Sequence, residues 1–280
     1  MHYTGYLRKL NTKPATPIEY HLNLDDKLFI PLNPHIGKQI QITFTGHIHC
    51  IACGKSIKKA YQQGYCFPCT QQLARCDLCI VKPELCHYHQ GTCREPSWGE
   101  AHCMKPHIVY LAYTSGVKVG ITRYTNMPYR WHDQGAVCAM PIYQVSTRLN
   151  AGLVEATLSQ WLNDKTNWRT MLSMPHTTDH EQSIIIEKLY EAKHLVQERL
   201  PSTQIKAYSQ DYPDPKPLFF NFPMQLTPSK IASINIQKKP DFCATLVGIK
   251  GQYLIFDTGV INIRKYSGHQ ISITIPLDHQ

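Results

Sequence analysis

Two apolar runs in the middle of the chain are separated by a short turn. The first run ends around Tyr110, the turn is Ser115-Gly116, and the second run covers residues 117–121. Alternating apolar positions on both sides of a Ser-Gly turn are typical of a β-hairpin. We therefore expect two antiparallel strands here, with Gly120 on the second strand.

A short helix is expected directly after this hairpin. Asn126 can cap a helix start, Pro128 suits the first helical turn, and Gly135 can end the helix. Arg130 then falls in the first turn.

Two longer helices follow in the pattern of apolar positions. The first has a helical stripe at Val154, Leu158, Trp161 and Leu162. Glu155 lies at the border of that stripe, where a carboxylate can look into a cleft between helix and sheet. The second helix should run from Gln182 to Leu200, with its apolar stripe at Ile185, Leu189, Ala192 and Val196.

The two ends of the chain carry similar segments. Residues 37–44 read GKQIQITF and residues 268–275 read GHQISITI, with apolar residues at matched positions upstream of each glycine. The pattern at each end predicts two strands joined by a turn, followed by a turn at the glycine and a third strand. A three-stranded sheet cannot easily bury its face alone, so we expect one β unit formed from both ends.

These patterns predict an α+β protein of several small parts. The expected division is a β repeat at 1–48, a zinc-binding region at 49–105 and a core at 106–175. A helix with a connector at 176–240 and a second β repeat at 241–280 complete it.

Eleven cysteines change the picture, because eight of them lie between Cys50 and Cys93. Residues 1–10 lack a long apolar run, so no targeting segment is expected, and no stretch of eighteen apolar residues occurs, so no membrane span is expected. In a reducing cytoplasm, where we expect this protein, clustered cysteines indicate metal rather than disulfides. Cys138 and Cys243 stand apart in apolar surroundings and are predicted to be small core residues.

The first cysteine group predicts one tetrahedral zinc site. Two C-x2-C pairs are separated by twelve residues, and the ligands are Cys50, Cys53, Cys66 and Cys69. Gly54 follows the first pair as in a zinc knuckle, and a helix start is expected after the second pair. A treble-clef or zinc-ribbon unit fits this order.

The second cysteine group offers more ligands than one zinc ion needs. We assign Cys76, Cys79, Cys86 and Cys93 to a second zinc, with Cys103 or His89 as replacements. An iron–sulfur cluster is the weaker alternative, since four thiolates suit one as well.

The formal net charge is +9, from 29 basic and 20 acidic residues. Basic residues interleave with aromatic ones, including Lys55, Lys58, Lys59 and Tyr61 near the first cysteine group. This balance favours nucleic acid, DNA or RNA, as the partner. Neither a membrane nor a small-molecule cofactor is expected.

The order Tyr110, Gly120, Arg130, Glu155, Asn167 resembles the GIY-YIG nuclease superfamily over about a quarter of the chain. The resemblance implies that Arg130 stabilises the phosphorane and Glu155 holds Mg²⁺ or Mn²⁺. It also implies that Asn167 positions the helix or the phosphate.

Lys118 stands where the second motif of that superfamily has tyrosine. Tyr110 or Lys118 would then handle the nucleophile's proton, and His132 is a reserve base. Longer strings, among them GTCREPSWGEAHC and DKTNWR, resemble a bacterial zinc-binding family without an assigned function.

The expected function is therefore metal-dependent cleavage of a phosphodiester in DNA or RNA. Two alternatives remain open. One is a non-catalytic, zinc-containing protein that binds nucleic acid, and the other is a zinc-stabilised protein–protein adaptor.

Overall fold

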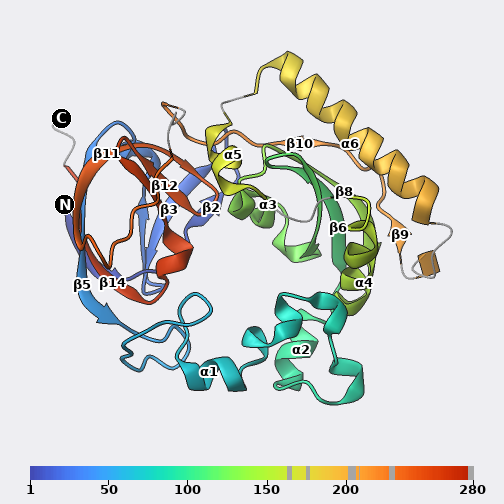
Figure 1. The fold of residues 1–280 in the computed structure, drawn as a ribbon, viewed down its shortest axis with the longest axis horizontal. Coiled ribbons are helices and arrows are strands. Elements are labelled where there is room, and N and C mark those ends of the chain that lie inside the picture. Colours follow the sequence, from blue (N-terminus) through green and yellow to red (C-terminus); the bar gives the residue numbers. More distant parts are fainter. Residues whose placement is uncertain (163–165, 175–176, 201–205, 208, 227–230, 277–280) are drawn as a thin grey trace. The chain divides into compact units, whose positions relative to one another are not determined.

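The computed structural model describes residues 1–162, 166–174, 177–200, 206–207, 209–226 and 231–276. It has a mixed α and β architecture and divides into two compact units (Figure 1). Unit 1 consists of Met1–Gln71, His132–Gly135 and Asn221–Gln280, and unit 2 of Gln72–Trp131 and Ala136–Phe220. The predicted zinc-binding region 49–105 is thus divided between the two units.

Unit 1 is built on a six-stranded antiparallel sheet to which both ends of the chain contribute. Its strands, in spatial order, are β1 (His2–Tyr6), β14 (His269–Thr274), β5 (Gln39–Ile48), β11 (Asp241–Lys250), β12 (Tyr253–Phe256) and β13 (Gly259–Asn262). The strands β2 (Asn11–Lys13), β3 (Glu19–Leu24) and β4 (Leu28–Pro31) form a separate sheet. Buried leucine and isoleucine side chains alternate along the strands of unit 1 and form its core.

The similar segments at the two ends have the same order of elements. Each is a hairpin, then a 3₁₀ turn, then a long strand: β3, β4, Asn33–His35 and β5 at one end, β12, β13, Ile263–Tyr266 and β14 at the other. Gly37 and Gly268 precede the third strand with φ of 86° and 83°, a conformation that favours glycine. The strands β5 and β14 then pair with each other.

Unit 2 contains the predicted hairpin. β6 (His107–Tyr113) and β7 (Val117–Arg123) pair with Tyr110 opposite Gly120. The sheet continues through β8 (Cys138–Val145), which pairs with β6, and two short strands, β9 (Gln210–Asp211) and β10 (Leu218–Phe219), pair with β8.

The two faces of this sheet have different cores. Val109 and Leu111 pack in a cluster with Val154 of α4 (Arg148–Leu158) and Leu189 of α6 (Asp179–Arg199). The intervening residues of β6, including Tyr110, point to the opposite face. There they pack with Trp131 of α3 (Tyr129–Gln134).

The helices largely follow the sequence pattern. α3 ends before Gly135, which has φ of 67°. In α6 the four predicted stripe residues are buried, and Thr178 and Glu181 form a capping box at its start. α4 is shorter than the stripe suggested, because it ends at Leu158. Within the described ranges, no helix is both long and apolar enough to cross a membrane.

Short elements join these parts. They are α1 (Phe67–Gln72), η2 (Ala74–Cys76), η3 (Leu78–Ile80), η4 (Pro83–Leu85), η5 (Tyr88–Gln90), α2 (Pro96–His102), η6 (Tyr124–Asn126) and α5 (Trp168–Ser173).

The two isolated cysteines differ. Cys138 is fully buried, as predicted, whereas Cys243 is exposed, so the prediction of a core role for Cys243 was wrong. In β11 the alternate residues Phe242 and Ala244 point into the core, and Cys243 between them therefore faces outward.

Candidate metal centres and the hairpin site

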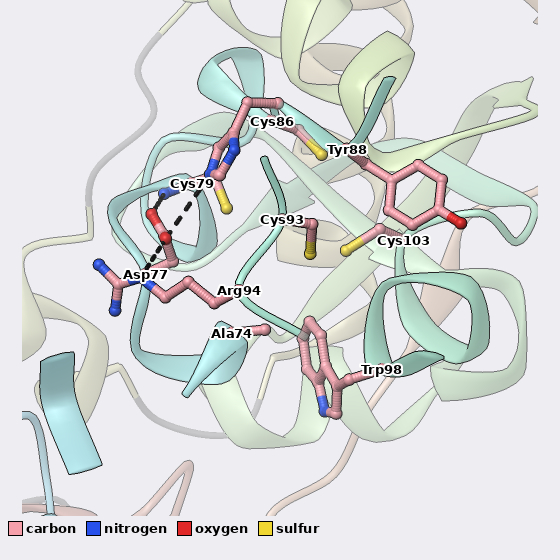
Figure 2. A pocket seen from close by; sticks show the side chains of 10 residues that line it. Ala74, Asp77, Cys79, Cys86, Tyr88, Cys93, Arg94, Trp98 and Cys103 are labelled. Carbon is pink, nitrogen blue, oxygen red and sulfur yellow. Dashed lines mark hydrogen bonds and ion pairs between the residues drawn. The ribbon is translucent and has the colours of Figure 1, made fainter. Parts of the chain in front are cut away.

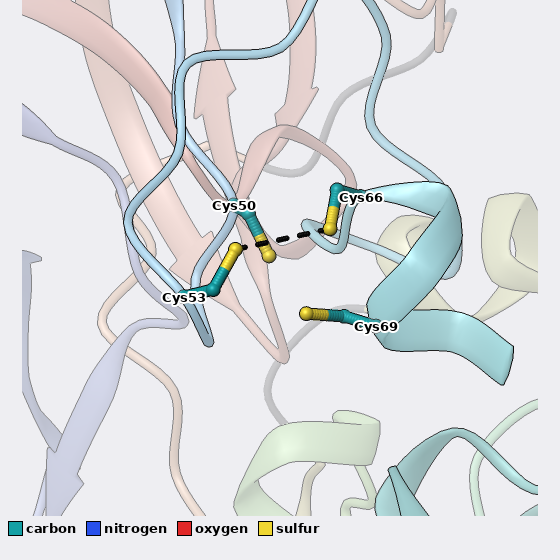
Figure 3. Close-up of side chains that lie close together, drawn as sticks. All are labelled: Cys50, Cys53, Cys66 and Cys69. Atoms are coloured by element: carbon teal, nitrogen blue, oxygen red, sulfur yellow. Dashed lines mark hydrogen bonds between the residues drawn. The ribbon is translucent and has the colours of Figure 1, made fainter. Parts of the chain in front are cut away.

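Four cysteines of unit 1 lie close together and could bind a zinc ion. The sulfur atoms of Cys50, Cys53, Cys66 and Cys69 all lie within 4.8 Å of one another (Figure 3). The Sγ atoms of Cys53 and Cys66 are 3.8 Å apart. Thiolates bound tetrahedrally to zinc at about 2.3 Å stand about 3.8 Å from each other, so the spacing fits the ion.

Local backbone structure explains why these thiols converge. Cys50 and Cys53 flank a tight turn in which the Gly54 N–H donates to the Cys50 carbonyl at 2.9 Å. Cys66 directly precedes α1 and Cys69 lies within it. The order of a turn and then a helix is the predicted one, but the helix begins at Phe67, inside the second pair, rather than after it.

The electrostatics of this cluster suit a cation. Burial alone would raise the pKa of the Cys50 thiol, yet hydrogen bonds lower it to about 6, chiefly from the backbone N–H groups of Cys53, Cys66 and Ala52. The pKa of Cys69 is raised instead, first by its hydrogen bond with Cys66 and then by burial. Without an ion, the neighbouring thiols must share protons, and a divalent cation can replace those protons.

The surface of this cysteine loop is basic and aromatic. Lys55, Lys58 and Lys59 are exposed, and the ammonium of Lys59 lies 5.2 Å from the centre of the Tyr61 ring. Tyr61 and Phe67 contact each other edge to face at 5.8 Å, although they are 39% and 58% exposed. Phe67 was not singled out from the sequence, because an aromatic residue at a helix start usually packs inward.

Unit 2 holds a second group of cysteines around a small cavity. Cys79, Cys86, Cys93 and Cys103 line a cavity of about 10 Å³ together with Tyr88 and Trp98 (Figure 2). Cys79, Cys86 and Cys103 are buried in one cluster. Burial raises the pKa of both Cys79 and Cys103 to about 11.

The cysteines that line this cavity differ from the predicted ligand set in one member. Cys76 is buried but does not line the cavity, and His89 is exposed and does not line it either. Cys103, which was predicted only as a replacement ligand, lines the cavity. Between Cys76 and Cys79 the extended residue Asp77 separates two 3₁₀ turns.

A polar group borders the cavity. The Asp77 carboxylate accepts from Arg94 Nε at 2.6 Å and lies 3.6 Å from His87 Nε2. Asp77, Cys79 and His87 also offer ligand atoms within 4.8 Å of one another. No sequence motif indicates this trio, because the turn η4 separates His87 from Asp77 and Cys79.

In the hairpin, Tyr110 and Lys118 point to the same face of the sheet. Tyr110 is fully buried, and its ring meets Trp131 edge to face at 5.7 Å. The ring also covers Gly120, where a Cβ would lie 2.7 Å from the tyrosine oxygen. Lys118 is 5% exposed. Arg130 is half-buried on α3, next to Trp131.

A wider groove lies on this same side of the sheet. It measures about 280 Å³, and its wall contains Trp131, Pro141 and Tyr212. The Trp131 indole nitrogen is buried without a hydrogen-bond partner in the described structure.

The other two predicted residues lie elsewhere. Glu155 is half-buried on α4, which packs against the face of the sheet opposite to Tyr110. Asn167 caps α5, because its side chain accepts from the N–H groups of Arg169 and Thr170. The Asn167 N–H donates to Ser115 Oγ of the hairpin turn at 2.9 Å.

His132, the reserve base, is buried rather than on the surface. Only 1% of it is exposed, and its Nδ1 lies 3.1 Å from Thr12 Oγ1. Burial lowers the pKa of His132 to about 4, so the ring is neutral at pH 7.

No curated protein and no solved structure matches this chain. A family model matches residues 37–271, which include both cysteine groups and the whole hairpin. The chain therefore belongs to the family described as protein of unknown function (DUF2797).

Proposed function

We propose that this protein binds nucleic acid through the surface of the first cysteine loop, ordered by a zinc ion. The observation that carries the proposal is the exposed basic and aromatic surface formed by Lys55, Lys58, Lys59, Tyr61 and Phe67. No acidic residue occurs in the sequence between Asp26 and Asp77, so no neighbouring carboxylate in that segment offsets the lysines.

The chemistry of this surface favours unpaired bases. Lysines that contact phosphates release counterions, which gives affinity without sequence preference. Exposed aromatic rings add stacking on bases, and a base can stack on a side chain only when it is outside a duplex. A single-stranded DNA or RNA segment is therefore the partner that fits best.

Salt-dependent binding tests this proposal. Fluorescence anisotropy with a labelled single-stranded oligonucleotide should show affinity that falls with salt, by roughly 0.7 log unit per log unit of salt for each phosphate contact. The variant K55Q/K58Q/K59Q removes three exposed lysines and should lower that slope by about 2. A triple variant at other exposed lysines, K13Q/K27Q/K188Q, is the matched control.

The control should bind as the unchanged protein does. Equal losses of affinity in both triple variants would mean that binding depends on the net positive charge of the protein and not on a defined site. An absence of binding at low salt would contradict the proposal and favour the adaptor alternative.

Metal-dependent cleavage by the hairpin site is the second candidate function. It is favoured by Tyr110 and Lys118 sharing one face with the helix of Arg130, beside a groove lined by Trp131 and Tyr212. In this proposal Tyr110 or Lys118 handles the proton, Arg130 stabilises the phosphorane, and Asn167 positions the helix or the phosphate.

Glu155, the expected ligand of Mg²⁺ or Mn²⁺, lies on α4 against the face of the sheet opposite to Tyr110, which counts against this candidate because a metal ligand has to reach the same substrate. Cleavage of DNA and RNA oligonucleotides with each ion, and its loss in E155A but not in E187A, tests this candidate. Glu187 is an exposed acid on α6 and serves as the control. If E155A cleaves as fast as the unchanged protein, the nuclease mechanism is wrong.

A further inference from the structure

We propose that Cys79, Cys86, Cys93 and Cys103 form a second zinc site in unit 2, separate from the site of unit 1. The four sulfur atoms surround one cavity, as Figure 2 shows. A cavity of about 10 Å³ has room for roughly one water-sized sphere. That room suits a single ion, and binding would draw the thiols together, since no three of their sulfur atoms lie within 4.8 Å of one another.

The segment that supplies these thiols needs such an ion. Between residues 72 and 106 the regular structure consists of 3₁₀ turns and the seven-residue helix α2. Leu78, Val81 and Leu85 are 58%, 81% and 48% exposed, so apolar burial contributes little here. Small segments without a sufficient core are commonly held by metals.

Each ligand comes from a different element, so one ion would tie the segment together. Cys79 lies in η3, Cys86 follows η4, Cys93 follows η5, and Cys103 caps α2. Gly99 of α2 allows the Tyr88 ring to approach closely, since a Cβ there would lie 2.7 Å from that ring and 3.3 Å from Cys93 Sγ.

The polar groups at the rim already have protein partners. Arg94 and the Cys79 N–H hold the Asp77 carboxylate, at 2.6 and 3.4 Å. The Nδ1 atom of His87 lies 2.7 Å from Thr92 Oγ1, and its Nε2 atom lies 3.6 Å from the Asp77 carboxylate. We therefore place Asp77 and His87 outside the ligand set, where they would surround the site and orient its loops.

The ion would also support the sheet of unit 2. η4 lies between Cys79 and Cys86 in the sequence, and it packs on α4 at Gly152. Arg148 of α4 donates to the Ile80 carbonyl at 2.7 Å. A metal at the four thiols would hold this loop in the conformation that α4 contacts.

Zinc content of the purified full-length chain and of single variants tests the assignment. Elemental analysis should find about two zinc ions in the unchanged protein and about one in C103S. C76S is the matched control, because Cys76 and Cys103 are equally buried at 4% and only Cys103 lines the cavity. It should retain about two zinc ions, and H87A should do the same.

X-ray absorption of the unchanged protein gives a result that does not depend on how the variants fold. It should show four sulfur neighbours per zinc at about 2.3 Å. A nitrogen or oxygen shell, or loss of zinc in H87A, would replace the proposal with a site at Asp77, Cys79 and His87. One zinc in the unchanged protein, bound iron, or zinc loss confined to C76S would also overturn it.

Discussion

Substituting Gly152 by alanine sets two effects of opposite sign against each other. Gly152 lies inside α4, where alanine favours the helix by about 1 kcal/mol over glycine. A Cβ at this position, however, would overlap the backbone of Pro83 and Glu84 and lie 2.7 Å from Pro83 Cβ. The sign of the stability change therefore depends on which effect is larger.

The overlap should win, because backbone atoms cannot rotate away as a flexible side chain can. Overpacking of this kind costs about 1–3 kcal/mol, and contact with two backbone groups places Gly152 at the upper end. Subtracting the gain in helix propensity leaves a net loss of about 2 kcal/mol. For a unit of this size, such a loss lowers the melting temperature by about 5 °C.

Thermal and urea unfolding of G152A, followed by circular dichroism, measures this loss. T157A is the control, since it raises helix propensity in the same helix without adding an atom. Its stability should change by less than about 0.7 kcal/mol. A G152A protein as stable as the unchanged chain, or more stable, would refute the close packing of η4 on α4.

Three further predictions concern single side chains. N167A should lose about 1 kcal/mol by removing the cap of α5, whereas N167D should keep it; equal losses in urea unfolding would contradict the capping role. Burial lowers the pKa of His107 to about 4, so folding favours the neutral ring. The contribution of His107 to stability is therefore fully present above pH 6.5 and is lost as pH falls towards 4. Between pH 6.5 and 4, at constant zinc, the free energy of unfolding of the unchanged protein should therefore fall by up to ~3 kcal/mol more than that of H107F. Parallel curves of unfolding free energy against pH for the two proteins would disprove this. Burial lowers the pKa of Lys250 to about 8, so charging it opposes folding, and stability should rise by up to ~3 kcal/mol between pH 8 and 10.5. In K250M, urea midpoints measured between pH 8 and 10.5 should not show this rise in stability. If the rise persists in K250M, other titrating groups cause it.

The parts that could be predicted from sequence are those with local causes. The hairpin of unit 2 follows from its Ser-Gly turn and its alternating positions, and the register that places Tyr110 opposite Gly120 follows from that turn. The first cysteine group could be predicted for the same reason, since a tight turn and a helix start supply both pairs.

The remaining features depend on contacts between distant segments. The second cysteine group draws on four separate elements, and the spacing of Cys76 and Cys79 did not indicate that only Cys79 of this pair lines the cavity. The side of the sheet on which α4 packs, and with it the place of Glu155, is likewise decided by tertiary packing. Local periodicity fixes which side of a helix is apolar, not which face of a sheet receives it.

The pairing of both chain ends in one sheet has a consequence for synthesis on the ribosome. β1 pairs with β14 and β5 pairs with β11. The first strands of unit 1 are therefore synthesised before nearly all of unit 2, and their partner strands are synthesised after it. Unit 2 is an insertion whose segments emerge together, and it can fold while the early strands are still incomplete. During that interval β5, whose residues 40 and 42 are apolar, has an unpaired edge of the kind that invites aggregation. Chaperone dependence of nascent chains should therefore be greatest before the last fifty or so residues are made, and joining the two ends while opening the chain near residue 221 should relieve it.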